Sequence, residues 1–382
     1  MQLASVGQSG VCQSSVCQSV RPSSPPSTTP APRRGRGATG NPANRFESRV
    51  LEPFDDGWDT LEGLAELPPL PTTLTRDASK SVISWNNSPD LGFDRAVNPY
   101  RGCEHGCIYC YARPTHAYLG YSPGLDFETR LVFKPEVAAL LERELRKPGY
   151  VCKPMALGSN TDPYQPVERT LKLTRAVLEV LERFGHPVSI VTKSAGVLRD
   201  MDILQRMAAR GLVRVYLSVT TLDAGLARRM EPRAAAPERR IAAIAALAQA
   251  GVPAAVLAAP MIPGLNDAEL EKILERASRA GARHAGYVLL RLPHELREMF
   301  EAWLGAHFPE RARHVLTLIR QTRAGQLNDS RFHERFMGQG AYAELLGQRF
   351  NRAARQWGFE DRVKLETRHF AVPGVVPQLS LF

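Results

Sequence analysis

The sequence has no run of about 18 or more apolar residues, so a membrane-spanning helix is not expected in its 382 residues. It also has few cysteines, six in all, and they are not spread in pairs along a short chain as in a secreted disulfide framework. Three of the six, Cys103, Cys107 and Cys110, lie within eight residues of one another. Clustered thiols in a long chain without an obvious secretion signal predict a metal site in a reducing compartment, and we expect a cytoplasmic protein.

Acidic residues are missing from residues 1–46, which contain five arginines, and residues 371–382 carry no charged side chain. Residues 47–309 contain equal numbers of basic and acidic side chains, whereas residues 310–370 have an excess of five basic ones. The formal net charge of +10 therefore belongs to the two flanks of the chain and not to its centre. This distribution excludes a uniformly basic nucleic-acid-binding surface.

Composition divides the chain into five parts. The first is rich in Ser, Pro, Gln and Gly. A short repeat in it contains Cys12 and Cys17, which are either a redox or metal-binding pair or part of a low-complexity sequence without a function. The five parts are a disordered basic arm (1–46), an N-terminal extension that packs on the main domain (47–90), the main domain (91–309), a basic helical C-terminal region (310–370) and a flexible tail (371–382).

The main domain alternates short apolar runs with longer helical periods. A glycine follows each of several helix ends and a β-branched run follows the glycine, as in successive β-α units. About six units can be counted, fewer than the eight of a full barrel, so we expect an α/β fold with a partial (β/α)6 TIM-type barrel and functional loops at the C-terminal strand ends. The expected strands are 94–98, 154–157, 187–192, 213–220, 252–260 and 285–290, and the expected helices include 167–184, 197–210, 237–250 and 267–280.

The clustered cysteines follow the first expected strand in the sequence Asn98-Pro-Tyr-Arg-Gly-Cys103-Glu-His-Gly-Cys107-Ile-Tyr109-Cys110-Tyr111. Three thiolates with the spacing Cys-x3-Cys-x2-Cys can hold three irons of a four-iron cluster. A fourth cysteine is absent nearby, which leaves one iron open to an exogenous ligand. The alternative is a zinc site with His105 or His116 as the fourth ligand.

This loop resembles the signature of the radical S-adenosylmethionine (SAM) superfamily, in which an aromatic residue precedes the last cysteine, as Tyr109 does here. The resemblance implies a partial barrel with a [4Fe-4S] cluster held by Cys103, Cys107 and Cys110. It also implies that S-adenosyl-L-methionine chelates the open iron and is reductively cleaved to a 5′-deoxyadenosyl radical, with an electron donor as partner.

The same resemblance suggests residues for SAM contacts. After the second expected strand, family members often present Gly-Gly-Glu to the methionine amino group; this sequence lacks it, and Ser159, Asn160 and Asp162 are its polar candidates. Lys193 ends the third strand, where a cation meets the methionine carboxylate, and Ser218 lies late in the fourth, placed for a ribose hydroxyl. The alternatives are a helix-capping Asp162, a strand-end surface Lys193 and a packing Ser218.

Three further segments narrow the resemblance to the branch containing spore photoproduct lyase and the PA0069/Rv2578c-type radical SAM family. Spore photoproduct lyases keep a hydrogen-donating cysteine just ahead of the polar segment after the second strand, where this sequence has Leu157 and Gly158. Cys152 lies upstream, and we expect it to pack in the core. The segments are Asn160-Thr-Asp-Pro-Tyr-Gln-Pro, Thr220-Thr-Leu-Asp with Met230-Glu-Pro-Arg233, and Ala259-Pro-Met-Ile-Pro-Gly-Leu-Asn-Asp267.

The last five residues, Gln378-Leu-Ser-Leu-Phe382, resemble the pentapeptide that binds the bacterial sliding clamp. Leu379, Leu381 and Phe382 would fill an apolar pocket while Gln378 bonds at its rim. The alternative is a tail that folds back over a barrel edge.

Taken together, these features predict a radical SAM enzyme that acts on DNA or another nucleic acid, or is delivered to it, without a membrane partner. The alternatives are a radical modifier or maturase of a protein or small metabolite, and a non-catalytic iron–sulfur module.

Overall fold

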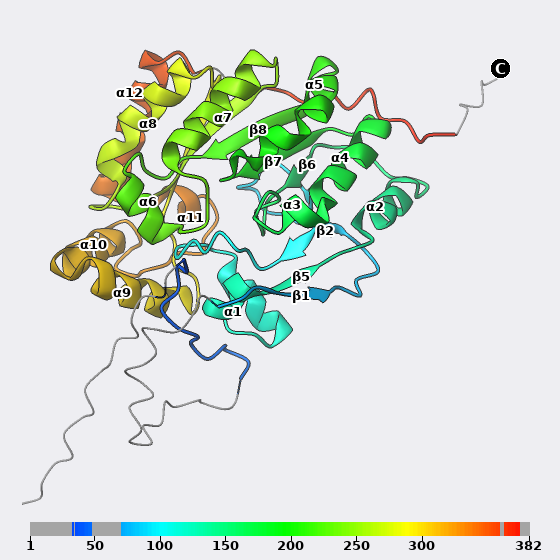
Figure 1. Ribbon diagram of the computed structural model, residues 1–382. Helices are drawn as coiled ribbons and strands as arrows, with labels where there is room; N and C mark the ends of the chain where they lie inside the picture. The colour runs from blue at the N-terminus through cyan, green and yellow to red at the C-terminus, as the bar shows by residue number, and fades with distance from the viewer. Residues whose placement is uncertain (1–32, 34, 48–69, 360–362, 375–382) are drawn as a thin grey trace, which may run out of the picture.

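The computed structural model describes residues 33, 35–47, 70–359 and 363–374 (Figure 1). Its centre is a sheet with the strand order β10-β9-β8-β7-β6-β3-β2, in which all neighbours are parallel except the short edge strand β2 (Ile83–Trp85). This order is linear, so the described residues form an open sheet and not a closed barrel. The parallel strands are β3 (Arg95–Val97), β6 (Met155–Leu157), β7 (Val188–Thr192), β8 (Val213–Ser218), β9 (Ala254–Met261) and β10 (His284–Leu289).

The mixed α/β class and all six expected strands are confirmed. Every residue of β3, β6 and β8 is buried, because helices and loops cover both faces of the sheet. Strands that are buried on both faces have continuous apolar sequences, and for this reason they could be predicted from the sequence.

Helices alternate with the strands and lie around the outside of the curved sheet (Figure 1). The expected helices are present, although three of the four differ at their starts. Lys172 adopts a left-handed backbone (φ 53°) and divides the expected helix 167–184, because the Glu168 carboxylate accepts the Thr174 backbone N–H at 3.1 Å and so caps the second half. Short 3-10 turns, Ala195–Asp200 and Asp267–Glu269, open two others. The helices are α3 (Glu168–Leu171), α4 (Leu173–Arg183), α5 (Met201–Ala209), α6 (Ala224–Met230), α7 (Pro237–Gln249) and α8 (Leu270–Arg279).

A long insertion separates β3 from β6 and supports the cysteine loop. Its strand β5 is the middle of a second, three-stranded sheet, β1-β5-β4. The N-terminal extension contributes β1 to this sheet and β2 to the main one, so its described part packs on the domain; residues 48–69 lie outside the described part. The elements are β1 (Thr73–Arg76), β4 (Tyr100–Arg101), a 3-10 helix (Arg113–Leu119), α1 (Leu125–Thr129), β5 (Arg130–Phe133) and α2 (Val137–Leu145).

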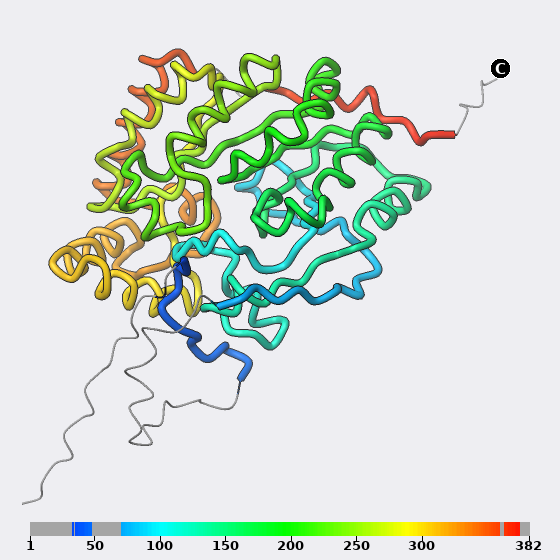
Figure 2. Tube along the Cα trace, in the orientation of Figure 1, coloured from blue at the N-terminus to red at the C-terminus, as the bar shows by residue number. Residues whose placement is uncertain are grey.

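Part of the predicted basic arm packs against the domain. The segment 35–47 (blue in Figure 2) lies beside the insertion, and Arg36, Ala38 and Asn44 are buried. This segment therefore differs from the disordered arm expected for 1–46. Residues 1–32, with Cys12 and Cys17, lie outside the described part of the chain.

The region 310–370 is largely helical, as its sequence pattern predicts. Helix α12 packs against α8, where Arg349 forms an ion pair with Glu271 (Nε–Oε1 2.7 Å). No helix among the described residues combines the length and apolarity needed to cross a membrane. The helices of the C-terminal half are α9 (Leu296–His307), α10 (Pro309–Gln321), α11 (Glu334–Met337) and α12 (Ala341–Gln356).

The chain beyond α12 returns to the sheet. The backbone N–H of Ala371 donates to the Phe184 carbonyl at 3.0 Å, at the N-terminal side of β7. His186 is fully buried there; Tyr150 Oη lies 2.8 Å from its Nε2, and its Nδ1 lies 3.0 Å from the Pro187 carbonyl. Burial lowers the pKa of His186 to about 4. The clamp-like residues 378–382 lie outside the described residues.

Candidate functional site

The cysteine loop leaves the C-terminal end of β3, the position predicted for function in a parallel sheet. Gly102 and Gly106 have left-handed φ values of 80° and 69°, which let the chain turn tightly before Cys103 and before Cys107. A Cβ on Gly102 would lie 2.8 Å from Leu131 Cδ2 and 2.9 Å from a backbone oxygen, so only glycine fits there.

The donor set fits an iron–sulfur cluster. Cys103, Cys107 and Cys110 are free thiols; the first two are buried and the third is half-buried. Burial raises the pKa of Cys107 to about 12 and that of Cys103 well above its ordinary value. Bare thiolates are therefore disfavoured in this loop, and a bound cation would be needed to hold them.

The two histidines considered for zinc have other partners. His105 Nδ1 lies 3.2 Å from Asp162 Oδ2, and His116 Nε2 lies 3.0 Å from the Arg130 carbonyl. Within the described residues, no group of three or more His, Cys, Asp or Glu side chains is arranged to hold a single metal ion. A four-iron cluster does not require this arrangement, because its three thiolates bind three different irons and need not converge on one point.

Asp162 joins the cysteine loop to the end of β7. Its carboxylate accepts the Thr192 hydroxyl and the Lys193 backbone N–H, each at 2.7 Å, and the Tyr164 N–H at 2.9 Å. Burial would raise its pKa, but His105 and these donors outweigh burial and lower the pKa of Asp162 to about 2. Asp162 thus stays ionised and positions the loop and Lys193, while α3 begins only at Glu168.

Two further predicted residues meet beside the cysteine loop. Lys193 Nζ donates to Ser218 Oγ at 2.7 Å, and Ser218 donates to the Ala259 carbonyl at 2.9 Å. The same ammonium lies 5.6 Å from the centre of the Tyr109 ring. A cation, a hydroxyl and the aromatic residue of the cysteine motif are therefore gathered at the ends of β7 and β8.

Ser159 and Asn160 lie over the start of the same loop. Asn98 Nδ2 donates to Ser159 Oγ at 3.1 Å, and Asn98 Oδ1 accepts the Asn160 N–H at 3.0 Å. The Tyr111 hydroxyl donates to the Ser159 carbonyl. All the described site candidates consequently belong to one region at the C-terminal strand ends.

A buried ion pair that the sequence analysis did not identify fixes Tyr109. Glu231 Oε1 lies 2.6 Å from Arg240 Nη2, and both side chains are at most 1% exposed. The Tyr109 hydroxyl donates to the other Glu231 oxygen, and Arg240 donates to the Ser218 carbonyl at 3.0 Å. Burial alone would raise the pKa of Glu231, but Arg240 and Lys193 hold it below its ordinary value. Glu231 belongs to a segment that the sequence analysis used only to recognise the family.

A second unpredicted pair supports the loop from outside. Arg113 Nη2 lies 2.5 Å from Glu128 Oε1 with both side chains fully buried, and Arg113 Nε donates to the Cys107 carbonyl at 2.8 Å. Glu128 also accepts the backbone N–H groups of Gly37 and Ala38 at 3.0 and 2.9 Å. A Cβ on Gly37 would lie 1.7 Å from the Gly106 carbonyl oxygen, so this N-terminal segment closes tightly on the loop.

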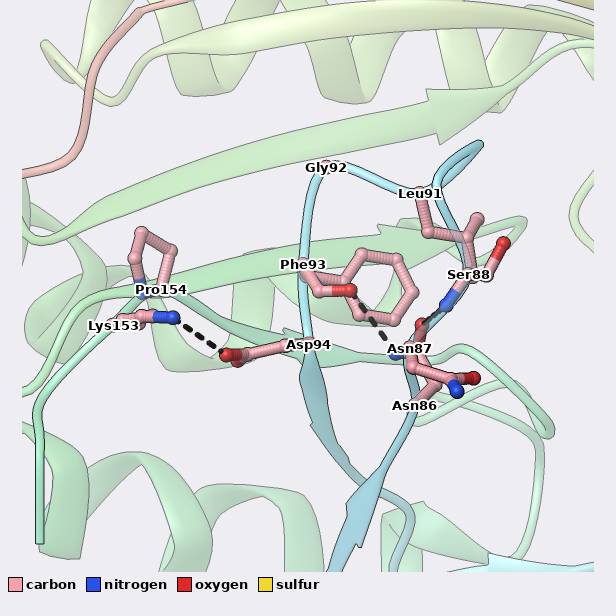
Figure 3. A pocket seen from close by; sticks show the side chains of 9 residues that line it. All are labelled: Asn86, Asn87, Ser88, Leu91, Gly92, Phe93, Asp94, Lys153 and Pro154. Carbon is pink, nitrogen blue, oxygen red and sulfur yellow. Dashed lines mark hydrogen bonds and ion pairs between the residues drawn. The ribbon is translucent and has the colours of Figure 1, made fainter. Parts of the chain in front are cut away.

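The pocket in Figure 3 lies away from these residues. It has a volume of about 350 Å³ and is bounded by Asp94, which precedes β3, and by Lys153, which precedes β6. Lys153 Nζ pairs with Asp94 Oδ2 at 3.0 Å across it. It therefore belongs to the N-terminal strand ends, opposite the cysteine loop. Cys152 lies at this end too, half-buried, and not fully in the core as expected.

Comparison with known proteins agrees with this geometry. Residues 97–277, from the last residue of β3 into α8, match the family model of the Radical SAM superfamily. This part of the chain therefore matches the radical SAM superfamily, the family that the cysteine motif resembles.

Individual relatives narrow the resemblance. The uncharacterised protein Rv2578c of Mycobacterium tuberculosis is 39% identical over 226 residues, which are 59% of this chain and 66% of that protein. The uncharacterised protein MJ0683 of Methanocaldococcus jannaschii is 30% identical over 178 residues, 47% of this chain and 64% of that protein. The chain thus spans just under two thirds of the length of these relatives.

Among solved structures, the fold is similar to that of spore photoproduct lyase. A variant of that lyase aligns with a TM-score of 0.54 at 16% identity, covering 82% of this chain and 86% of the lyase. The lyase complexed with dinucleoside spore photoproduct aligns with a TM-score of 0.53 at 16% identity, covering 74% and 79%.

Proposed function

We propose that the protein is a radical SAM enzyme in which Cys103, Cys107 and Cys110 hold a [4Fe-4S] cluster and SAM binds at the open iron. The observation that carries this proposal is the set of three free thiols on a glycine-shaped loop at the C-terminal strand ends, inside a matched radical SAM segment. The bound cofactors would supply a 5′-deoxyadenosyl radical for hydrogen abstraction, after an electron arrives from a donor partner.

The chain's own residues have separable tasks in this proposal. Lys193 provides a cation for the methionine carboxylate, and Ser218 provides a hydroxyl for the ribose. Both already contact each other, so a ligand can replace one bond with another of the same kind. Asp162 has its oxygens satisfied by the protein and acts by positioning Lys193. Ser159 and Asn160 remain as polar groups for the methionine amino end.

Cluster binding is tested by anaerobic reconstitution of the full chain, with iron and sulfide counted and 5′-deoxyadenosine measured after reduction. Cys107→Ser should lose bound iron and cofactor cleavage, because serine is a poor ligand for the cluster. Cys152→Ser is the matched control and should keep both, since Cys152 lies at the opposite strand ends. A fully loaded wild-type cluster that never cleaves SAM would refute the enzyme and leave an iron–sulfur module.

We further propose that the substrate is a nucleic acid. Support comes from a surface of stacked arginine and aromatic side chains that begins on the cysteine loop. The Arg291 guanidinium lies 5.0 Å from the Tyr111 ring centre and 5.4 Å from that of Phe336. Arg335 lies 4.7 Å from Phe336, and Tyr111 is 46% exposed. The exposed Tyr111 ring, backed by the half-buried Arg291, offers a face on which an unpaired base can stack.

Reversal of a thymine dimer with a cysteine donor after β6 is not part of this proposal. Leu157 is buried, and a Cβ on Gly158 would lie 2.2 Å from the Val191 carbonyl oxygen, so a cysteine does not fit at Gly158. We expect single-stranded or duplex DNA to change the rate of cofactor cleavage. An unchanged rate with every nucleic acid would favour a protein or small metabolite as substrate instead.

Delivery to DNA through the sliding clamp is proposed for Gln378, Leu379, Leu381 and Phe382. The basic C-terminal helices precede this tail, which supports a role near polyanionic DNA. The free thiols of the loop favour a reducing compartment, and we propose the cytoplasm.

A further inference from the structure

A second cavity, of about 400 Å³, lies beside the cysteine loop and is lined by cationic side chains. Three segments meet there: the N-terminal segment with Arg33 and Arg36, the end of α6 with Arg228 and Arg229, and the end of α9 with His307. Figure 2 shows the first of these (blue) running beside the gold helix pair α9 and α10. Among the described residues that line the cavity there is no carboxylate.

These cations lack counter-ions in the described part of the chain. Arg228 and Arg229 are exposed, and no described carboxylate pairs with either guanidinium. Arg229 instead lies 5.0 Å from the Phe308 ring centre. Burial and the nearby Arg229 both lower the pKa of His307.

The two carboxylates that act electrostatically on Arg36 are already engaged with other arginines. Glu104 pairs with Arg233 (Oε1–Nη2 3.0 Å), and Glu128 pairs with Arg113. Arg36 donates to the Glu128 backbone carbonyl at 3.0 Å rather than to the carboxylate, and burial followed by Arg233 lowers its pKa. Arg33, Arg228 and Arg229 therefore meet at one cavity without a carboxylate partner among the described residues, beside the buried Arg36, an arrangement that an anion would stabilise.

Arginine favours a phosphate among anions because its planar fork matches two phosphate oxygens. The cavity is also joined to the site: Pro232 on its wall follows Glu231, and Arg36 precedes Gly37, which closes on Gly106. A ligand bound here would thus contact the two segments that hold the cysteine loop in position.

We propose that this cavity binds a backbone phosphate of the nucleic acid on which the enzyme acts. The inference rests on the proposed nucleic-acid substrate, and it identifies the place where the nucleic-acid strand crosses the protein. Phosphates in the cavity position the strand, while the Tyr111 and Arg291 surface contacts its bases.

The test uses the full, cluster-loaded chain and a fluorescein-labelled single-stranded oligodeoxynucleotide, with binding followed by anisotropy from low to moderate salt. The double variant Arg228→Gln/Arg229→Gln should weaken binding about tenfold or more. It should also lower the slope of log affinity against log salt by about 0.7 for each phosphate that the variant no longer neutralises. Both side chains are exposed, so the variant is expected to fold.

The matched control removes the same charge at the N-terminal strand ends, opposite the cysteine loop, as Arg210→Gln/Arg283→Gln; both side chains are exposed, and this variant should bind nearly as the wild type does. Equal binding by the two double variants would overturn the cavity while leaving the nucleic-acid substrate intact. No binding by the wild type would overturn both. Inorganic phosphate, titrated at constant ionic strength, should compete in the wild type; competition that is unchanged in Arg228→Gln/Arg229→Gln would also refute the cavity.

Discussion

The buried Glu231–Arg240 pair provides the sharpest prediction about how the cysteine loop is held. Replacing Glu231 by Gln leaves the Arg240 guanidinium, which is 1% exposed, without a counter-charge. Breaking a buried pair by removing one partner costs about 3–5 kcal/mol. Loss of the charged acceptor for the Tyr109 hydroxyl adds to the cost, because the Gln amide offers one neutral oxygen where the carboxylate served both Arg240 and Tyr109.

The assay is urea unfolding of the anaerobic, cluster-loaded protein, followed by circular dichroism, with bound iron counted in parallel. The matched control is Glu238→Gln, which removes the partner of Arg276 in a surface pair of similar geometry (Nη1–Oε1 2.5 Å). An exposed pair contributes about 0–1 kcal/mol, so the control should unfold nearly as the wild type does. If Glu231→Gln destabilised the protein no more than Glu238→Gln does, the buried pair would not support the loop.

Three other predictions concern the N-terminal segment 35–47 that contacts the cysteine loop, the C-terminal tail and the buried His186. Gly37→Ala should displace the segment over the cysteine loop and speed iron loss to a chelator, whereas Gly305→Ala, in open space on α9, should not; equal rates would show that close contact at Gly37 is unimportant. Leu381→Ala/Phe382→Ala should abolish binding to a purified sliding clamp in a pull-down, and unaltered binding would remove that partner. His186 has a pKa near 4 in the folded protein and about 6.5 when unfolded, so the unfolded chain takes up the extra proton and stability falls as pH drops from about 6.5 to 4. In urea unfolding at a series of pH values, His186→Leu should lower the free energy of unfolding at neutral pH but reduce its fall with decreasing pH. An unchanged pH dependence of the free energy of unfolding would contradict this role of His186.

The β-α framework could be predicted because its signals are local. A glycine just past a helix, followed by a β-branched run, marks a unit without knowledge of its neighbours, as at Gly185 before β7 and Gly211 before β8. The break at Lys172 could not be predicted in this way, because Glu168 supplies its carboxylate across the turn and is itself held by Tyr100 and Arg199. Tertiary contacts decided where that helix began.

The cysteine loop was predictable for a similar reason, since its spacing carries the chemistry within eight residues. The charged side chains that hold the loop in position could not be predicted. Glu231 and Arg240 lie more than a hundred residues after the loop, and Glu128 lies in the insertion. In the sequence these charged residues cannot be distinguished from solvent-exposed ones, and only the folded structure shows that they are buried.

Because some of these carboxylates are buried in ion pairs, the zero net charge of residues 47–309 does not describe the charge at the protein surface. Equal numbers of acidic and basic residues suggest a neutral centre, yet the folded chain uses some carboxylates in buried pairs beside the cysteine loop, as Glu231 and Glu128 show. A carboxylate committed to one arginine cannot neutralise another at a distance, because its field is largely cancelled by its partner. Arg228 and Arg229 therefore have no carboxylate partner among the described residues although the segment sums to zero, and they meet Arg33 and Arg36 from the basic N-terminal flank. The positive charge relevant to a polyanion is thus concentrated next to the site by pairing elsewhere, which net charge along the sequence does not reveal.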